Sequence, residues 1–337
     1  MSVQASSTSN DAPRRGSLRS RGAAAVSIAT LRNVSAVLPP ERAWGLWAAR
    51  QIVARVMDTF GPSLAGSHVE HVDEIMADGR RVVGEWVYGR NVGKGASAIY
   101  FVHGSGYALC SPRTHRRLTA WLSSLTGLPV FSVDYRLAPR HRFPAAALDV
   151  RAGWDWLLGE QHLSTDRLVI AGDSAGGHLA ADLLLQSDVE HPAGVVLFSP
   201  LADLTFARSR AREALRRDPA IRAADAARLI ALYCGDTDPS HPRLRLDVAG
   251  GRRMPPTLIQ AGGAEMLVSD ARALAADITA AGGSCELEVW PDQVHVFQAL
   301  PKLAPEAVPA MRRAASFISE SLRRNHIDQD HANQVAG

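Results

Sequence analysis

The sequence predicts an α/β fold built on a mostly parallel sheet of eight strands. Short apolar runs of strand length alternate with longer segments of helical periodicity, which is the pattern of a parallel sheet with helical crossovers. Several runs are apolar at every position, as expected of strands that are buried on both faces. With 337 residues, of which 46% are hydrophobic, the chain is long enough to bury a large core.

The N-terminal part divides into two segments of different composition. Residues 1–22 form a basic tail rich in serine, arginine and glycine, which we expect to be disordered because it has little to bury. Residues 23–64 are expected to form cap helices, since apolar side chains recur at helical spacing between Glu41 and Phe60. Gly61-Pro62 ends that pattern.

The main domain is expected over residues 65–324, with a polar tail over residues 325–337. Two alternating segments flank an Asp-Gly turn and predict an antiparallel hairpin, and the other strands are apolar runs. The predicted strands cover residues 69–76, 82–87, 98–102, 130–135, 168–171, 194–198, 257–261 and 285–290. Helices are predicted from residues 111, 144, 175, 269 and 305. The Arg/Ala-rich residues 203–250 interrupt this alternation, and we expect them to be an exposed excursion that forms a second part of the cap.

The stretch from residue 168 to 180 carries the most informative motif. An apolar run leads into Gly172-x-Ser174-x-Gly176, and an Ala/Leu-rich segment of helical period follows. Strand, tight turn and helix are the context that makes Gly-x-Ser-x-Gly a nucleophile elbow. Both glycines are expected to be required because a side chain there would collide with neighbouring backbone. The motif alone leaves open a glycine-rich turn without a catalytic role.

Polar groups follow several of the predicted strands. Residues 103–106 come after the third strand, Ser174 after the fifth, Glu265 after the seventh and His295 after the eighth. In open α/β sheets, ligands bind beyond the carboxyl ends of the strands, so these groups are expected to meet at one edge. The order serine, acid, histidine is that of an α/β-hydrolase triad.

Five segments, in order, resemble the hormone-sensitive-lipase-like family (bacterial family IV) of carboxylesterases and lipases. They read HGSGY at 103–107, DYRLAPRHRFPAA at 134–146, GDSAGG at 172–177, GGAEMLVSDA at 262–271 and VHVF at 294–297. The resemblance runs from about residue 65 to 322, after a helical N-terminal segment. It implies the α/β-hydrolase fold, with a mostly parallel eight-stranded sheet flanked by helices and an N-terminal helical cap.

The resemblance assigns roles to residues of this chain. It implies that Ser174 is the nucleophile, His295 the general base and acid, and Glu265 the acid that holds the imidazolium. The other implied sets are the backbone N–H groups of Ser105, Gly106 and Ala175 as oxyanion hole, and His103, Gly104 and Asp173 as loop-shaping residues. Apart from the resemblance, Tyr107, Trp44 and Trp47 are candidate pocket residues, with plain packing under or within the cap as the alternative. His115 lies on a predicted helix beside two arginines and is interpreted as part of a solvated face.

Two residues depart from the pattern of the family. Ser105 stands where the loop usually has a glycine, so the oxyanion hole survives only if Ser105 adopts the required backbone conformation. Glu265 stands where many members have an aspartate, and a glutamate can reach the same imidazole nitrogen. Asp270 is the alternative acid, which we rank lower because it lies inside a predicted helix.

The resemblance implies a serine carboxylic-ester hydrolase that cleaves short- to medium-chain acyl esters through an acyl-enzyme, with no metal or other cofactor. One alternative is a lipase acting at a membrane or lipid surface, attached through the basic tail and the Trp44/Trp47 helix. Another is a catalytically silent small-molecule-binding protein of the same fold, against which the presence of His295 argues. A homodimer is a further implication of the resemblance.

Composition excludes other classes of protein. The formal net charge is +3, and residues 1–32 carry an excess of arginine, so the remainder is close to neutral. Basic residues are not clustered with aromatic ones, so nucleic-acid binding is not expected. Three widely spaced cysteines indicate neither a disulfide framework nor a metal site and favour a reducing, cytoplasmic location. No apolar segment is long enough to span a bilayer.

Overall fold

The computed structural model describes residues 15–29, 32–33, 37–238 and 240–336, with side chains in the last helix described to Arg324. A single eight-stranded sheet runs through the molecule in the order β1-β2-β4-β3-β5-β6-β7-β8. The strands are β1 His68–Ile75, β2 Arg81–Tyr88, β3 Ala98–Val102, β4 Val130–Val133, β5 Leu168–Asp173, β6 Gly194–Phe198, β7 Thr257–Gly262 and β8 Cys285–Trp290. Only the pairs β1·β2 and β2·β4 are antiparallel, which confirms the predicted α/β-hydrolase architecture.

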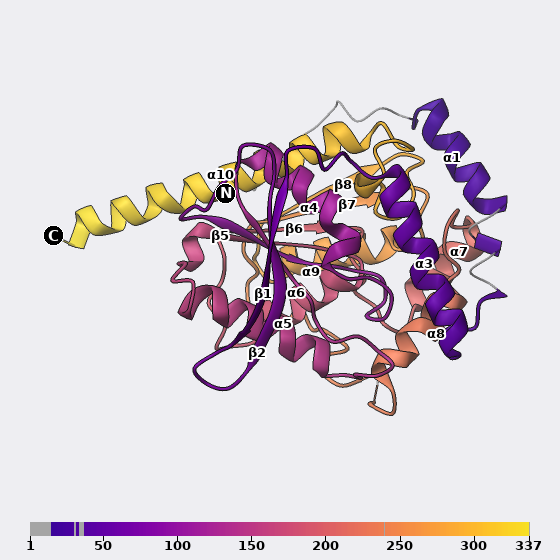
Figure 1. The fold of residues 1–337 in the computed structure, drawn as a ribbon, viewed down its shortest axis with the longest axis horizontal. Helices are drawn as coiled ribbons and strands as arrows, with labels where there is room; N and C mark the ends of the chain where they lie inside the picture. Colours follow the sequence, from indigo (N-terminus) through magenta and orange to yellow (C-terminus); the bar gives the residue numbers. More distant parts are fainter. Residues whose placement is uncertain (1–14, 30–31, 34–36, 239, 337) are drawn as a thin grey trace.

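Helices cover both faces of the sheet (Figure 1). They are α1 Leu18–Ala29, α3 Ala43–Phe60, α4 Pro112–Thr126, α5 Ala145–Gly159, α6 Ala175–Leu185, α7 Ala207–Leu215, α8 Ala223–Cys234, α9 Val268–Ala280 and α10 Ala307–Ala336, with 3₁₀ turns at Thr165–Arg167 and Phe297–Ala299. One face packs against α4 and α10, and the other packs against α5, α6 and α9. Every residue of β3, β5, β6 and β7 is buried, which explains their uninterrupted apolar character.

The prediction of a disordered tail over residues 1–22 is wrong for its last part. Helix α1 begins at Leu18, and its first turn is attached to the body because Ser17 and Ser20 donate hydrogen bonds to the Glu306 carboxylate. Small side chains such as Ala24 and Ser27 are buried on the inner face of this helix. Residues 1–14 of the predicted tail lie outside the described residues.

The predicted C-terminal tail also differs from the structure. The backbone of α10 continues as a helix to Ala336, through most of the segment that the sequence analysis assigns to a polar tail. Residues 323–336 contain neither glycine nor proline, so nothing in this segment interrupts the helix. No helix in the described part of the chain is long and apolar enough to cross a membrane.

Candidate active site

Ser174 occupies the turn between β5 and α6. Its backbone has φ 51° and ψ −121°, an unusual conformation for a residue with a side chain, and α6 starts at the next residue. The turn is possible only because glycines flank it. A Cβ on Gly176 would lie 2.0 Å from the carbonyl oxygen of Val102, and one on Gly172 would lie 3.0 Å from that same oxygen. The expected collision is therefore confirmed at Gly176, whereas a side chain at Gly172 would be a tight contact that requires the neighbouring backbone to shift by a few tenths of an ångström.

His295 and Glu265 come together at the carboxyl end of the sheet. Nδ1 of His295 lies 2.5 Å from Oε2 of Glu265, although the two residues are thirty positions apart. Glu265 follows β7 and is buried, and His295 follows β8. His295 and Ser174 line the same cavity. Asp270, the alternative acid, instead accepts the backbone N–H groups of Ala202 and Asp203.

The other oxygen of the Glu265 carboxylate is held by two donors. Oε1 accepts the backbone N–H of Gly262 at 2.6 Å and the hydroxyl of Ser199 at 2.7 Å. Ser199 in turn accepts the backbone N–H of Val296, the residue after His295, at 3.1 Å. Ser199 therefore links the acid to the histidine loop. The sequence analysis missed it, and its place directly after β6 is the only signal that points to it.

The carboxylates around His295 favour its protonated form. Burial alone would lower the pKa of His295, but the adjacent Glu265 carboxylate and the more distant Asp218 and Asp173 raise it above the ordinary value. Asp218 is buried beside this site, where its carboxylate accepts the backbone N–H groups of Ala220, Ile221 and Met266. Burial raises the pKa of Asp218. A base with a raised pKa is suited to receiving a proton from a hydroxyl group.

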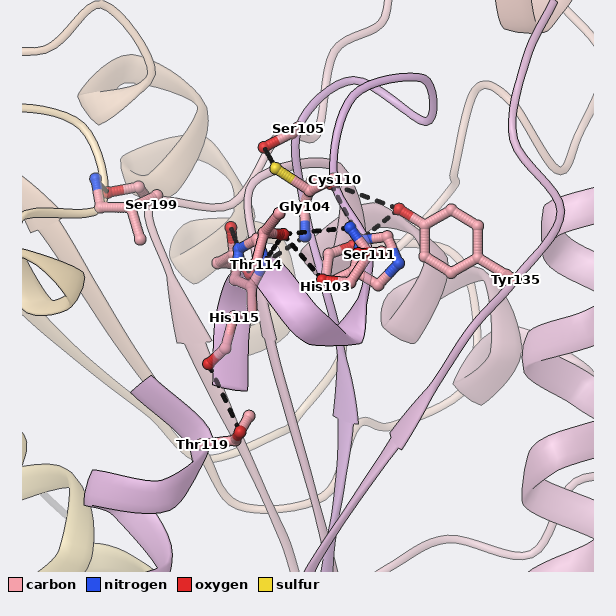
Figure 2. Close-up of polar contacts among 12 residues, drawn as sticks. His103, Gly104, Ser105, Cys110, Ser111, Thr114, His115, Thr119, Tyr135 and Ser199 are labelled. Atoms are coloured by element: carbon pink, nitrogen blue, oxygen red, sulfur yellow. Dashed lines mark hydrogen bonds and ion pairs between the residues drawn. The ribbon is translucent and has the colours of Figure 1, made fainter. Parts of the chain in front are cut away.

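The loop after β3 has a left-handed backbone over three residues, with φ of 76° at Ser105, 61° at Gly106 and 59° at Tyr107. Ser105 thus adopts the region that glycine occupies most easily. Its hydroxyl accepts a hydrogen bond from the thiol of Cys110 at 2.8 Å (Figure 2). Burial raises the pKa of that thiol to about 11. The loop lies against the elbow, because a Cβ on Gly104 would lie 2.8 Å from Cβ of Ser174.

Asp173, next to the nucleophile, attaches this loop to the elbow. Its carboxylate accepts the backbone N–H of Gly104 at 3.0 Å and lies 3.2 Å from Nε2 of His115. Burial alone would raise the pKa of Asp173, but the neighbouring histidines lower it below its ordinary value. The interpretation of His115 as part of a solvated face is wrong. It is buried and lines the cavity, and its Nδ1 lies 3.1 Å from the hydroxyl of Thr114.

His103 contacts the backbone of the loop that follows β3. Its Nδ1 lies 3.2 Å from the carbonyl oxygen of Gly104, and its ring stacks on Tyr135. The Tyr135 hydroxyl donates to the carbonyl oxygen of His103 at 2.8 Å, as Figure 2 shows. Burial and the nearby His115 lower the pKa of His103 to about 3, so this ring is neutral at physiological pH. His103 is therefore a structural residue of the loop, as expected.

A cavity of about 680 Å³ lies above Ser174 and His295, and its walls are mostly apolar. Helix α3 contributes one wall through its inner face, and α1 and α8 contribute others. The lining includes Ala23, Ile52, Val53, Val56, Met57, Phe60, Leu109, Leu201, Phe206, Leu229, Ile230, Met266 and Leu303. Ser105, Gly106 and Cys110 line it beside the nucleophile.

All three residues predicted to line the pocket lie elsewhere. Trp44 and Trp47 are 57% and 64% exposed, because α3 turns the opposite face towards the cavity. Tyr107 is fully buried, and its ring stacks on Tyr233 with the centroids 4.0 Å apart. The helical periodicity of α3 is correct in the sequence analysis, but periodicity does not identify which apolar face turns inward.

This chain is similar to known α/β-hydrolase-fold proteins. The model of the alpha/beta hydrolase fold family (Abhydrolase_3) matches residues 99–299. Carboxylesterase/phospholipase LipF of Mycobacterium tuberculosis is 35% identical over 254 residues, which cover 71% of this chain and 66%, just under two thirds, of LipF. Esterase LipU of the same organism is 35% identical over 237 residues, covering 66% of this chain and 78% of LipU.

Solved structures agree with these sequence matches. The crystal structure of an esterase from the bacterial hormone-sensitive lipase family has a TM-score of 0.78 at 30% identity and covers 89% of this chain and 98% of its own. EstE5 has a TM-score of 0.79 at 30% identity, covering 91% of this chain and 99% of its own. The chain therefore belongs to the α/β-hydrolase fold family, and it is similar to esterases of the bacterial hormone-sensitive lipase family.

Proposed function

We propose that this chain is a serine carboxylesterase that hydrolyses esters of short- and medium-chain acids through an acyl-enzyme intermediate. The observation that carries the proposal is the 2.5 Å contact between His295 and Glu265 in the cavity that Ser174 lines from a strained elbow. An imidazole held by a buried carboxylate beside an elbow serine is the arrangement of a nucleophilic triad.

In the first half of the reaction, Ser174 Oγ attacks the ester carbonyl carbon while His295 accepts the hydroxyl proton. Negative charge develops on the carbonyl oxygen, where the backbone N–H groups of Ser105, Gly106 and Ala175 donate hydrogen bonds to it. The alcohol leaves with the proton from His295. In the second half, His295 takes a proton from water as the water oxygen attacks the acyl carbon. The bond between the acyl carbon and Ser174 Oγ then breaks, His295 returns the proton to Oγ, and the acid is released.

The cavity suits an uncharged acyl group. Its volume of about 680 Å³ and its apolar walls suit an alkyl chain and not a charged group. A structure of EstE5 was obtained after soaking with p-nitrophenyl butyrate, which supports the shorter end of the proposed range of acyl lengths.

Hydrolysis of p-nitrophenyl esters of increasing acyl length tests the proposal, with Ser174→Ala as the comparison. We expect wild-type turnover that peaks at short or medium acyl length, and covalent labelling of Ser174 by a fluorophosphonate. Ser174→Ala should lose both. Wild-type protein that neither turns over any ester nor accepts the label would refute the enzyme proposal and favour a small-molecule-binding protein instead.

A further inference from the structure

Most of the exposed apolar side chains lie at the end of the molecule formed by α1, α3, α7 and α8, here termed the cap end. Among the described residues, nine large apolar side chains are exposed, and seven of these belong to α1, α3, α7 or the connection before α3. The seven are Leu18, Val26, Ile28, Val37, Trp44, Trp47 and Leu215, here termed the apolar rim. The other two, Ile75 and Leu148, lie on β1 and α5. Isolated exposed apolar residues are normal, but such a concentration indicates an interaction surface.

These elements lie together in space. Figure 1 shows α1, α3, α7 and α8 gathered at one end of the molecule, opposite the end from which α10 extends. The rim residues include two tryptophans that are more than half exposed, one turn apart on α3. Leu18 and Leu215 are 83% and 87% exposed. The rim residues are therefore strongly exposed and are carried by elements that gather at one end of the molecule.

The same segments carry positive charge. Residues 15–60 and 207–218 contain twelve arginines and four acidic residues. Arg19 and Arg21 on α1 are exposed beside Leu18, and Arg55 is exposed on α3. The four acids offset only part of this charge and leave an excess of eight arginines: Glu41 pairs with Arg228, Asp58 with Arg117 and Glu213 with Arg32, and Asp218 is buried.

Exposed tryptophan and aliphatic side chains interspersed with arginine are typical of helices that lie in a membrane interface. A second copy of this chain fits less well, because pairing two rims would bring like charges together. We propose that the cap end binds the lipid–water interface of an anionic membrane through the apolar rim. This inference rests on the proposed esterase function for its purpose, since it brings the site to esters held in lipid.

The position of the cavity supports this assignment. Helices α1 and α3, which carry five of the seven rim residues, also contribute walls of the cavity, whereas α7 does not line it. Val26 belongs to both sets, because it is 62% exposed and also lines the cavity. Docking of the rim on a membrane would therefore hold the cavity beside the lipid phase, where an apolar ester chain partitions.

Flotation of the full chain with vesicles tests the proposal. We expect it to float with phosphatidylcholine vesicles that contain about 30% phosphatidylglycerol at low salt, and to float less as salt increases. The double variant Trp44→Ala/Trp47→Ala should lower the partition coefficient at least roughly tenfold. Arg19→Gln/Arg21→Gln should lower it by about fivefold for each arginine removed. The matched control Ile75→Ala/Leu148→Ala removes apolar residues away from the rim and should bind as wild type.

Two further readouts separate this proposal from the esterase proposal. The rim variants should keep wild-type kcat/KM on dissolved p-nitrophenyl butyrate, which also shows that they fold, and should lose turnover of an ester embedded in anionic vesicles. Ser174→Ala should bind vesicles as wild type without turnover. The proposal is overturned if wild-type protein does not float with anionic vesicles at low salt, or if Trp44→Ala/Trp47→Ala binds as wild type. The proposal is also overturned if light scattering shows that the wild-type protein is a dimer and that Trp44→Ala/Trp47→Ala is a monomer.

Discussion

The substitution Ser199→Ala tests whether the candidate acid is held in place by its neighbours. Ser199 is fully buried, donates to Oε1 of Glu265 at 2.7 Å and accepts the N–H of Val296 at 3.1 Å. It does not belong to the described lining of the cavity, so it does not contact substrate there. Its removal therefore changes the support of the acid and of the histidine loop without changing the substrate pocket.

The size of the effect follows from the two hydrogen bonds. A hydrogen bond to a charged group contributes about 1.5–3 kcal/mol, and an unpaired buried N–H costs about 1–3 kcal/mol. Relaxation of the loop would offset part of this, so we expect the free energy of unfolding to fall by about 2–4 kcal/mol. Because Glu265 keeps the Gly262 donor and the contact with His295, catalysis should weaken and not vanish. We expect kcat to fall by about 10- to 100-fold at constant KM.

Urea unfolding and steady-state kinetics on p-nitrophenyl butyrate measure the two effects. Ser321→Ala is the matched control, since Ser321 is a buried serine on α10 whose hydroxyl has no hydrogen-bond partner in the described part of the chain. It should change stability by less than about 1 kcal/mol and leave kcat unchanged. A Ser199→Ala variant with wild-type kcat, or with a raised KM at unchanged kcat, would refute the role assigned to Ser199.

Two further substitutions test the electrostatics of the site. Glu265→Gln removes the charge that raises the pKa of His295. The acid limb of the kcat/KM profile, which rises as His295 loses its proton, should therefore move to lower pH, and the plateau should fall by about 10³–10⁴-fold. An acid limb that stays at the same pH would contradict the assignment. His115→Asn removes a donor from buried Asp173, and we expect about 2 kcal/mol less stability at neutral pH. The lowered pKa of Asp173 contributes stability above the ordinary aspartate pKa, so this deficit should shrink as pH falls below it, and a pH-independent deficit in urea unfolding would count against an electrostatic role.

The strands and the elbow could be predicted because each is encoded locally. A run of apolar β-branched residues forms a buried strand whichever strands it pairs with. The Gly-x-Ser-x-Gly motif requires small residues because of the close backbone contacts of the turn itself. The contact between His295 and Glu265 follows from the same logic, because both residues come just after strands that end at one edge. Position along the chain was sufficient for these residues.

The residues that the prediction missed or misplaced depend on tertiary packing. His115 lies between arginines in sequence, yet α4 packs so that its side chain reaches Asp173, which also holds the loop after β3. Trp44 and Trp47 share a helix that has apolar residues on two faces, and the pairing of α3 with the cavity decides which face is inside. A helical period defines faces but not their surroundings, and so these side chains could not be placed from the sequence.

The replacement of glycine by Ser105 shows which constraints this loop obeys. Gly104 is fixed by space, since an added Cβ would lie 2.5 Å from the backbone carbonyl oxygen of Asp173, whereas at Gly106 the nearest atom, at 2.5 Å, is the end of the flexible Leu229 side chain. Position 105 has room for a side chain, and its positive φ alone disfavours serine, at a cost of about 1–2 kcal/mol. The hydrogen bond from Cys110 offsets part of that cost and fixes the hydroxyl beside the cavity (Figure 2). The backbone that carries the candidate oxyanion donors is thus retained, while the surface next to the attacked carbonyl gains a polar group that glycine would not provide.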